Sequence, residues 1–353
     1  MSNEVHYSDY LQLDKILEAQ HPESERRNEP AHDEMLFIVI HQAYELWFKQ
    51  LLFETDSVIR IMEQPSLNDN SPELQTVVHR LARCGTILKV LVHQIDIMET
   101  MTPMDFLDFR DMLRPASGFQ SWQFKLLEAR LGLKYEHRYG QAYYVSQLRQ
   151  PEIDTIKMAE QGPSLLQLVN NWLERMPFFR LPAGGPLPSM GSTPPQDHGI
   201  AFWANYRQRY LESLADSEKS NLPLFDKIFF GAPSPDGPFA ESRMLSPSAC
   251  RAALFIMLYR GYPILQLPFQ VLNQLLEIDE QLSTWRYRHM SMVHRMIGTR
   301  IGTGGSTGKD YLSAALLKHH LYKEVAALTS FLIERKRLPQ LDTEMERRLG
   351  FVH

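Results

Sequence analysis

Cysteine is scarce in this sequence of 353 residues, which holds only Cys84 and Cys250. Two cysteines cannot form the disulfide framework of a small secreted protein, and the first residues, MSNEVHYSDYLQLDK, include neither a basic leader nor an apolar signal stretch. Long apolar runs are also lacking, since none approaches the roughly 18 residues that a membrane-spanning helix needs. We therefore expect a cytoplasmic protein with no membrane partner.

An excess of positive charge is missing as well. The 37 basic and 42 acidic residues are mixed along the chain and give a formal net charge of −5. Binding to nucleic acid or to an anionic lipid surface needs a concentrated basic face, so we expect neither partner. With 44% hydrophobic and 22% charged residues the composition is that of a globular protein, and a small ligand is the expected partner.

The alternating polar and apolar pattern of half-buried β-strands is nearly absent too. Apolar residues instead recur at intervals of three and four, which predicts an all-α fold, a helical bundle. Ser71-Pro72 and Gly162-Pro163 place proline in the first turn of two helices, and Asp33 is the predicted N-cap of a third. The predicted helices cover residues 8–19, 33–64, 72–100, 118–131, 163–176, 263–281, 282–299 and 310–333.

Two irregular stretches interrupt the helical pattern. Residues 177–195 and 231–247 are rich in proline and glycine, which predicts loops. The segment 199–230 between them is helical and rich in aromatic residues, so we interpret it as an excursion from the bundle. We expect one domain over residues 1–353, with a helical and loop insertion at about 177–247.

The first stretch with chemical potential is HDEMLFIVIHQAYELWFKQLLFE, residues 32–54. At helical spacing His41 shares a face with Phe37, Tyr44 and Phe48. A buried histidine satisfied by one hydrogen bond is the usual meaning of this pattern. The functional alternative is a hydrogen-bonding group on the floor of an aromatic pocket, suited to a flat and mostly apolar ligand with one N–H group.

A second stretch is MTPMDFLDFRDMLRPASGFQSWQFKLLE, residues 101–128. Phe106, Arg110 and Leu113 lie on one helical face before a turn. An arginine in this setting usually pairs with a carboxylate, here Asp108 or Asp111, and the sequence alone favours that interpretation. The alternative is a bidentate clamp for a ligand carboxylate, because the guanidinium group matches its geometry and keeps its charge.

A third stretch is WRYRHMSMVHRMIGTRIGTGGSTG, residues 285–308. His289 shares a helical face with Trp285 and two methionines, and His294 shares another with Tyr287 and Met290. Methionine stripes are most often plain core. Either histidine could instead serve as a haem ligand, since iron needs a neutral imidazole in apolar surroundings.

The glycine-rich end of that stretch is similar to a phosphate-binding loop but departs from its register. The loop motif requires glycine at position 303 and serine or threonine at 310, where this chain has Thr303 and Asp310. The run also follows a helix where a phosphate loop follows a strand. It predicts a turn whose backbone N–H groups and Thr303 hydroxyl could close over a small ligand, or simply a connection between helices.

Together these stretches resemble the tryptophan 2,3-dioxygenase family. The residues that carry the resemblance are DEMLFIVIHQAYELWFKQ, DFRDML with PASGFQS, and WRYRHMSMVHRMIG with GTGGSTG, supported by YSDYLQLDKIL and SLLQLVNNWLER. They occur in order from Tyr7 to about Pro339. The resemblance implies an enzyme with a b-type haem, Fe²⁺ in its active form, enclosed by the helical bundle.

The resemblance also implies roles for the matching residues at the iron and the indole. His289, and not His294, matches the proximal iron ligand. His41 matches the distal histidine that accepts a hydrogen bond from the indole N–H. Phe37 and Phe106 match the aromatic walls of the indole pocket, and Leu113 matches another apolar contact.

Other matching residues are implied to hold the charged groups of the substrate. Arg110 matches the group that grips the carboxylate, and Thr303 the one that meets the ammonium group together with a haem propionate. Ser117 and Gly118 match residues that line the same cavity. The pair Lys309-Asp310 departs from the aromatic-containing pair of many family members, which puts the tightness of loop closure in question.

Tyr7 and Tyr10 match tyrosines that family members insert into a neighbouring subunit's site, which implies a homotetramer, a dimer of dimers. The implied reaction inserts both atoms of O₂ across the indole C2–C3 bond of L-tryptophan and gives N-formyl-L-kynurenine, the first step of the kynurenine pathway. A related haem enzyme acting on a substituted tryptophan is an alternative. A haem sensor without enzyme activity is another, less compatible with Arg110, Thr303 and His41.

Overall fold

The computed structural model describes residues 4–138, 146–176, 198–231, 244–300, 302, 316 and 319–350. Every regular element in these ranges is an α-helix or a 3₁₀ helix, which confirms the predicted all-α fold. None of the helices found in them is long and apolar enough to span a membrane.

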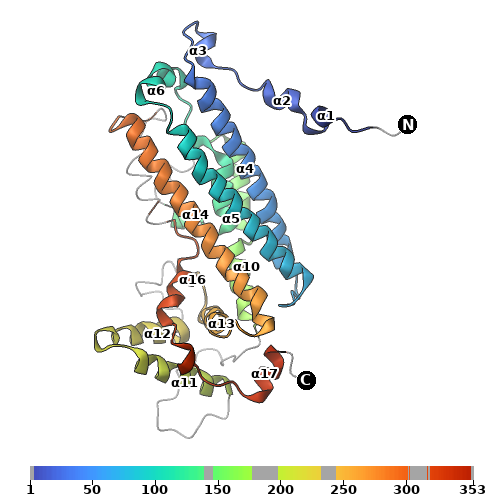
Figure 1. The fold of residues 1–353 in the computed structure, drawn as a ribbon, viewed down its shortest axis with the longest axis vertical. Helices are drawn as coiled ribbons and strands as arrows, with labels where there is room; N and C mark the ends of the chain where they lie inside the picture. The colour runs from blue at the N-terminus through green and yellow to red at the C-terminus, as the bar shows by residue number, and fades with distance from the viewer. Residues whose placement is uncertain are drawn as a thin grey trace.

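Three long helices lie side by side and form the body of the molecule (Figure 1). They are α4 (Asp33–Met62), α5 (Pro72–Met98) and α14 (Gln266–Ile297). The prediction of two helices in place of α14 was wrong. Neither glycine nor proline occurs between residues 269 and 297, and the buried face continues through Leu282, so nothing ends the helix near residue 281.

The sequence predicted the starts of three helices, and the structure confirms one of them. Ser71 accepts a hydrogen bond from the backbone N–H of Leu74, and Pro72 is the first residue of α5. Asp33 is not the N-cap of α4 but its first helical residue, where its carboxylate faces the positive end of the helix dipole. Helix α10 (Leu165–Glu174) begins after Ser164, which caps it by accepting from the N–H of Gln167.

Shorter α-helices follow α5 in the chain. They are α6 (Pro103–Arg110), α7 (Trp122–Leu131) and α9 (Gln150–Gln161). Helix α7 packs against both α4 and α9. The helix predicted over 118–131 is divided: η2 (Gly118–Gln120) ends at Ser121, whose side chain caps α7. Further 3₁₀ helices are η1 (Asp111–Leu113), η3 (Tyr135–His137), η4 (Asp216–Glu218), η5 (Pro263–Leu265) and η7 (Arg335–Arg337).

A second group of helices lies at the opposite end of α14 (Figure 1). Residues 199–230 are helical as predicted and form α11 (His198–Ser213) and α12 (Asn221–Phe230). The others are α13 (Pro247–Leu258), which the sequence analysis missed along with α9, and α16 (Lys323–Ala327), η6 (Leu328–Phe331) and α17 (Thr343–Leu349). The predicted loops at 177–195 and 231–247, and the start of the helix predicted at 310–333, lie largely outside the described residues.

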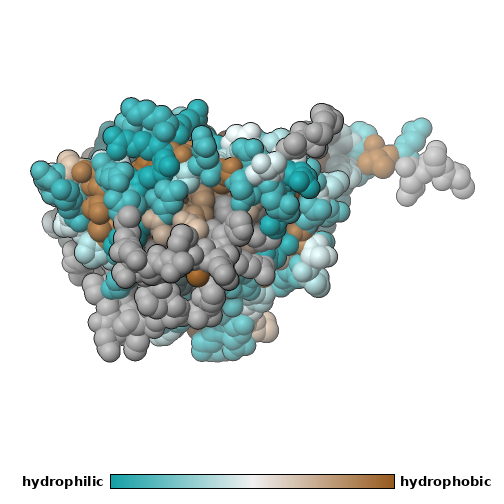
Figure 2. All heavy atoms as spheres, turned by 90° about the horizontal axis from the view of Figure 1, so that it is seen from below, coloured by the Kyte–Doolittle hydropathy of each residue, from teal (hydrophilic) through white to brown (hydrophobic). Residues whose placement is uncertain are grey.

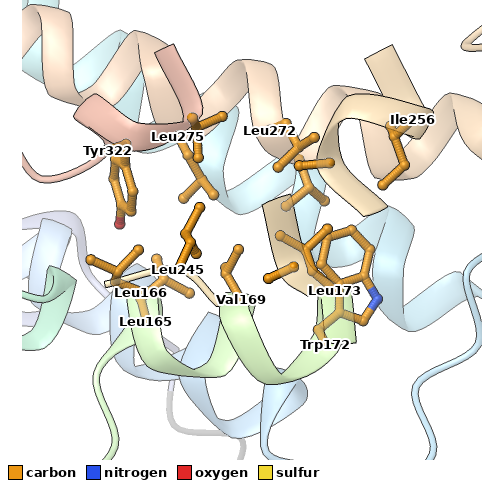
Figure 3. Close-up of a cluster of buried hydrophobic side chains, with 14 of the residues drawn as sticks. Leu165, Leu166, Val169, Trp172, Leu173, Leu245, Ile256, Leu272, Leu275 and Tyr322 are labelled. Carbon is orange, nitrogen blue, oxygen red and sulfur yellow. The ribbon is translucent and has the colours of Figure 1, made fainter. Parts of the chain in front are cut away.

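The buried core connects these helices to the long ones. Figure 3 shows leucine, valine and tryptophan side chains of α10 facing Leu272 and Leu275 of α14, with Ile256 of α13 and Tyr322 beside them. Aromatic side chains of α11 and α12 belong to the same buried cluster, Trp203 and Phe225 among them. Continuous burial of this kind fixes the long helices that carry the site described below.

The N-terminus forms an arm that leaves the body of the molecule. It holds α1 (Tyr7–Leu11) and α2 (Leu13–Leu17), which have no buried residue, and it stands clear of the other helices (Figures 1 and 2). The single helix predicted over 8–19 is broken at Gln12, whose φ is 52°. The base of the arm is anchored at α3 (Glu23–Arg26), because the Glu34 carboxylate accepts from two backbone N–H groups there, at 2.8 and 2.9 Å.

Candidate functional site

A cavity of about 300 Å³ opens among α4, α5, α6, α7 and α14. This volume lies in the range of small-ligand pockets. Its lining is mostly apolar, with phenylalanine and methionine prominent. From α4, α5 and α6 come Phe37, His41, Tyr44, Glu45, Phe48, Ile95, Met98, Phe106 and Arg110; the turn before α7 and α7 itself give Ser117, Gly118, Phe119, Ser121, Phe124, Lys125 and Glu128; α14 gives Trp285, Arg286, His289, Met292, Val293, Met296 and Ile297; Met101, Gly302 and His319 complete it.

His289 projects into this cavity from the last third of α14. Its imidazole lies parallel to the indole of Trp285 one turn earlier, with 5.1 Å between ring centroids and 8° between planes. Burial, with His41 nearby, lowers the pKa of His289 to about 4, so its imidazole is neutral at physiological pH. His294, the alternative from the sequence, is exposed on another face of α14.

His41 lies on the α4 wall of the same cavity. Its Nδ1 is 2.7 Å from the carbonyl oxygen of Phe37, and because a carbonyl can only accept, Nδ1 must carry the proton. Nε2 is therefore a hydrogen-bond acceptor. Burial lowers the pKa of His41 and favours this neutral form, although the Phe37 carbonyl and Glu45 act in the opposite direction.

Aromatic rings form the wall beside His41. Phe37 contacts the His41 ring at 4.1 Å between centroids and stacks with Phe106 at 5.7 Å and 27°. Phe109, fully buried, meets both phenylalanines edge-on. Leu113 packs against the adjoining apolar cluster but is not among the residues that line the cavity. The wall is flat and apolar, as an aromatic ligand requires.

Arg110 ends α6 and lines the cavity while almost wholly buried, with 4% of its surface exposed. Arg110 Nη1 lies 3.9 Å from Asp111 Oδ1, and the Asp111 side chain is 77% exposed. That contact is long and open to solvent, so by itself it is a weak ion pair. Ser117 and Gly118 follow on the same side of the cavity, and a side chain at Gly118 would meet no other atom within 4 Å.

Four further ionisable residues line the cavity, and the sequence analysis missed them. Lys125 and Glu128 come from α7, Arg286 from α14, and His319 from the segment before α16; all four are buried. Their separation in the sequence, from 125 to 319, explains the omission, because no local motif connects them. Glu128 and Arg286 form an ion pair at 2.7 Å.

Other residues that the sequence predicted for the site are not found among the residues that line the cavity. Thr303 and the pair Lys309-Asp310 are outside the described residues, although Gly302, next to Thr303, lines the cavity. Tyr7 and Tyr10 are on the N-terminal arm, 72% and 73% exposed, and are not part of this chain's own cavity lining. Within the described ranges no group of three or more His, Cys, Asp or Glu side chains is placed to hold a metal ion by itself.

The fold and the site define a class: an all-α protein with a mostly apolar cavity, in which two neutral histidines face a space suited to flat ligands. Comparison of this sequence with known proteins identifies the family. A sequence model described as tryptophan 2,3-dioxygenase matches residues 1–222 and 239–332. The chain therefore belongs to the tryptophan 2,3-dioxygenase family, whose members are oxidoreductases.

Individual relatives extend over nearly the whole chain. The tryptophan 2,3-dioxygenase of Bdellovibrio bacteriovorus is 41% identical over 374 residues, which cover 98% of each chain. That of Alteromonas mediterranea is 42% identical over 373 residues, covering 98% of this chain and 97% of the relative. The enzyme of that name from Xenopus laevis is 40% identical over 363 residues, 97% of this chain and 85% of the relative.

Proposed function

We propose that this chain is a haem-dependent dioxygenase that converts L-tryptophan to N-formyl-L-kynurenine in the cavity between His41 and His289. Family membership supports the substrate and the reaction. The observation that carries the assignment of the site is the presence, in one apolar cavity, of two neutral imidazoles, an aromatic wall and a buried arginine.

The residues around His289 fit a b-type haem. An iron porphyrin brings its own equatorial nitrogen ligands and needs one side chain as axial ligand, commonly a histidine. His289 is neutral, as iron ligation requires, and Trp285 fixes the plane of its ring. Apolar residues on the same helix, Met292 and Val293, line the space beside it. When bound as Fe²⁺, the haem supplies the reactivity toward O₂ that amino-acid side chains lack.

The opposite wall fits the indole and the carboxylate of L-tryptophan. Phe37 and Phe106 offer flat apolar surfaces to the ring. His41 has its Nε2 available to accept a hydrogen bond from the indole N–H, because its Nδ1–H donates to the Phe37 carbonyl. Arg110 can bind the carboxylate through two parallel hydrogen bonds. We assign the ammonium group to Thr303, which lies outside the described residues.

Positioning is the main contribution of the chain itself. The overall reaction breaks the indole C2–C3 bond and places one oxygen atom of O₂ on each carbon, so it consumes no external electrons. Arg110 and His41 hold the two ends of the amino acid, which orients the ring toward the His289 side of the cavity. Phe37 and Phe106 keep water from that face of the ring. His41 orients the indole N–H and does not need to remove its proton.

Assembly into a homotetramer, a dimer of dimers, forms part of the proposal. Helices α1 and α2 are too short to be stable alone and bury no residue of their own, so they need a surface outside this chain's body. The exposed Tyr7 and Tyr10 on α1 have the amphipathic character of residues buried at interfaces. We propose that the arm completes the cavity of a neighbouring subunit.

We further propose that residues 1–353 form one domain, that the protein acts in the cytoplasm, and that its product enters the kynurenine pathway. The continuous buried cluster from α4 through α10 to α11 and α12 supports a single domain, with the segment at about 177–247 as an insertion. Two buried free cysteines are compatible with a reducing compartment.

The test is oxygen consumption by the haemin-loaded, reduced protein given L-tryptophan. The proposal predicts N-formyl-L-kynurenine as the product, with both oxygen atoms incorporated when the gas is isotopically heavy O₂. Incorporation of one atom, or turnover of a ring-substituted tryptophan alone, would contradict it. Haem binding without oxygen consumption would indicate a sensor or carrier.

A further inference from the structure

A second pocket lies at the start of α14, far from His289. Its volume is about 470 Å³, which is within the range of small-ligand sites. Gln266, at its exposed edge, precedes His289 by 23 residues on α14, which is about 35 Å along the helix. Figure 1 shows this start of α14 beside α13 and α17. None of the residues that line the second pocket is among the described residues that line the cavity of His289. They are Leu258, Tyr259, Arg260, Gly261, Tyr262, Gln266, Phe269, Arg335 and Leu338.

The more buried residues of this pocket are aromatic or aliphatic. Tyr259 is buried, and the partly buried residues are Leu258, Tyr262, Phe269 and Leu338. The rings of Tyr259 and Tyr262 lie 6.4 Å apart between centroids. Side chains of this kind offer flat apolar surfaces, so the inner part of the pocket suits a flat apolar group.

Hydrogen bonds within the chain hold the walls of the pocket in place. The Tyr259 hydroxyl donates to the carbonyl oxygen of Pro339 at 2.7 Å, which ties the end of α13 to the segment after η7. The backbone N–H of Tyr262 donates to the carbonyl oxygen of Tyr259 at 3.0 Å. Gln266 Nε2 donates to the carbonyl oxygen of Arg260. The pocket is therefore preformed, as binding sites for small molecules usually are.

Two arginines stand at the exposed rim of the pocket. Arg260 and Arg335 are both exposed, and the guanidinium carbon of Arg260 lies 4.8 Å from the centroid of the Phe269 ring. Neither arginine forms an ion pair with a carboxylate of the described residues, and the described lining holds no aspartate or glutamate. Two cations beside an apolar surface favour a ligand that carries a negative charge.

The carboxylates close to this pocket have other partners. Glu334, which precedes Arg335 in the sequence, pairs with Lys336 at 3.1 Å. Glu346 Oε1 accepts a hydrogen bond from the Tyr262 hydroxyl at 3.1 Å. The two rim arginines are therefore available to an anionic ligand.

We propose that this pocket binds small aromatic carboxylates that carry no ammonium group. The aromatic body lies against Tyr262 and Phe269, and the carboxylate meets Arg260 and Arg335 at the rim. A guanidinium group can donate two parallel hydrogen bonds to a carboxylate. An ammonium group is repelled by the two arginines and finds no carboxylate in the described lining. An α-amino acid should therefore bind here more weakly than the same acid without its amino group.

The first test compares indole-3-propionate, which is L-tryptophan without its ammonium group, with the neutral indole-3-propionamide. Each is titrated by calorimetry into the haem-loaded, full-length protein, kept free of O₂ and saturated with L-tryptophan so that the cavity of His289 is occupied. We expect one bound acid per chain, with an affinity about tenfold to a hundredfold above that of the amide. Equal affinities, or no binding of the acid, would overturn the proposal.

The second test locates the bound acid with Arg260→Met and Arg335→Met. Each variant should bind indole-3-propionate at least about tenfold more weakly than the wild type does. Arg26→Met, at an exposed position of α3, is the matched control and should bind the acid unchanged. Circular dichroism checks that the variants fold. Unchanged affinity in both pocket variants would overturn the proposal.

The same titration of Arg110→Ala separates this pocket from the cavity of His289. Arg110→Ala should bind the acid as the wild type does, because Arg110 belongs to the other site. Loss of binding in Arg110→Ala alone would put the acid in the cavity of His289 and overturn the proposal. A protein that bound the acid through Arg260 but bound neither haem nor L-tryptophan would contradict the proposed function and support this pocket.

Discussion

Single residues account for most of the chemistry that we assign to the cavity. His41 and His289 are the same residue type in one apolar space, yet they differ in their partners. His41 donates to a backbone carbonyl and offers Nε2 as an acceptor, whereas His289 stacks on an indole and is suited to bind iron. Their assigned roles follow from those partners.

Replacing Arg110 should weaken the binding of L-tryptophan. Loss of a bidentate charged pair costs on the order of 2–3 kcal/mol, so Arg110→Ala should raise KM roughly 30-fold to 150-fold with a smaller effect on kcat. Arg114→Ala is the control, because Arg114 is an exposed arginine that pairs with the same Asp111 at 3.1 Å. Steady-state kinetics would refute the assignment if KM were unchanged in the Arg110 variant.

Replacing His41 should reduce turnover without abolishing it. An orienting hydrogen bond contributes less than proton transfer by an obligatory base, whose removal costs about 100-fold to 10,000-fold. We expect His41→Ala to lose less than about 100-fold in kcat. A loss of about 100-fold to 10,000-fold, measured at saturating L-tryptophan, would indicate that His41 removes a proton.

The sequence predicted those site residues that stand in local patterns. Helical spacing put His41 with Phe37, and put His289 with Trp285, but it could not choose between His289 and His294. Only the resemblance made that choice. In the structure His289 lines the cavity and His294 is exposed.

At the scale of elements, α7 and α14 are joined by charge as well as by apolar packing. Glu128 on α7 meets Arg286 on α14 and Arg138 beyond the end of α7. Asp279, two turns before Arg286, accepts from the backbone N–H groups of Leu321 and Tyr322 at 3.0 and 3.1 Å. The helix that carries His289 therefore also holds the backbone of Leu321 and Tyr322 in place.

Glu128→Gln should strongly destabilise the protein. It would remove the carboxylate that pairs with the buried Arg286 at 2.7 Å and with the buried Arg138 at 2.6 Å, and breaking a buried pair in this way costs about 3–5 kcal/mol. Urea unfolding near neutral pH measures the loss. Glu212→Gln is a suitable control, because the exposed Glu212 side chain accepts a hydrogen bond from Gln208 on the surface of α11.

The same interaction should depend on pH. Because the arginines beside Glu128 hold its pKa in the folded state below the usual value of about 4.5, the contribution of Glu128 to stability is fully present above that pH and is lost as pH falls toward the folded pKa. The stability difference between wild type and Glu128→Gln should therefore shrink below about pH 4.5. A difference that stayed constant down to about pH 3 would show that ionisation of Glu128 does not stabilise the fold.

The sequence contains the information for the length of α14 but not for the contacts between α7 and α14. Absence of glycine and proline in the second half of α14 was visible, and it should have predicted one continuous helix. The charged contacts between α7 and α14 were not visible, because residues 128 and 286 meet only after the chain has folded.

At the scale of the whole molecule, the helices of the N-terminal arm, α1 and α2, bury no residue within a single chain. Val5, Leu11, Ile16 and Leu17 are exposed on it along with the two tyrosines. Apolar side chains on a segment without its own core are typical of contacts between subunits. The resemblance implied this arrangement, and nothing in composition or helical periodicity could have done so.

Mixing two impaired variants, assayed at an L-tryptophan concentration well below the raised KM, tests the shared site. One carries Tyr7→Ala with Tyr10→Ala, and the other carries Arg110→Ala. When they are co-expressed, about a quarter of the sites should combine an intact Arg110 with an intact arm from a neighbour, and activity should rise accordingly. Failure of the mixture to exceed the sum of the separate variants would contradict exchange of arms.

The central claim is that His289 holds an iron porphyrin inside this cavity. The most direct test is the absorption spectrum of the reduced, haemin-loaded protein titrated with L-tryptophan, for the wild type, His289→Gly and His294→Gly. For the wild type we predict one haem per chain and a histidine-ligated ferrous spectrum that shifts when L-tryptophan is added. His289→Gly should lose this spectrum and recover it in added imidazole. His294→Gly should have the same spectrum as the wild type. A wild-type spectrum retained by His289→Gly, or a wild-type protein that binds no haem, would contradict the account.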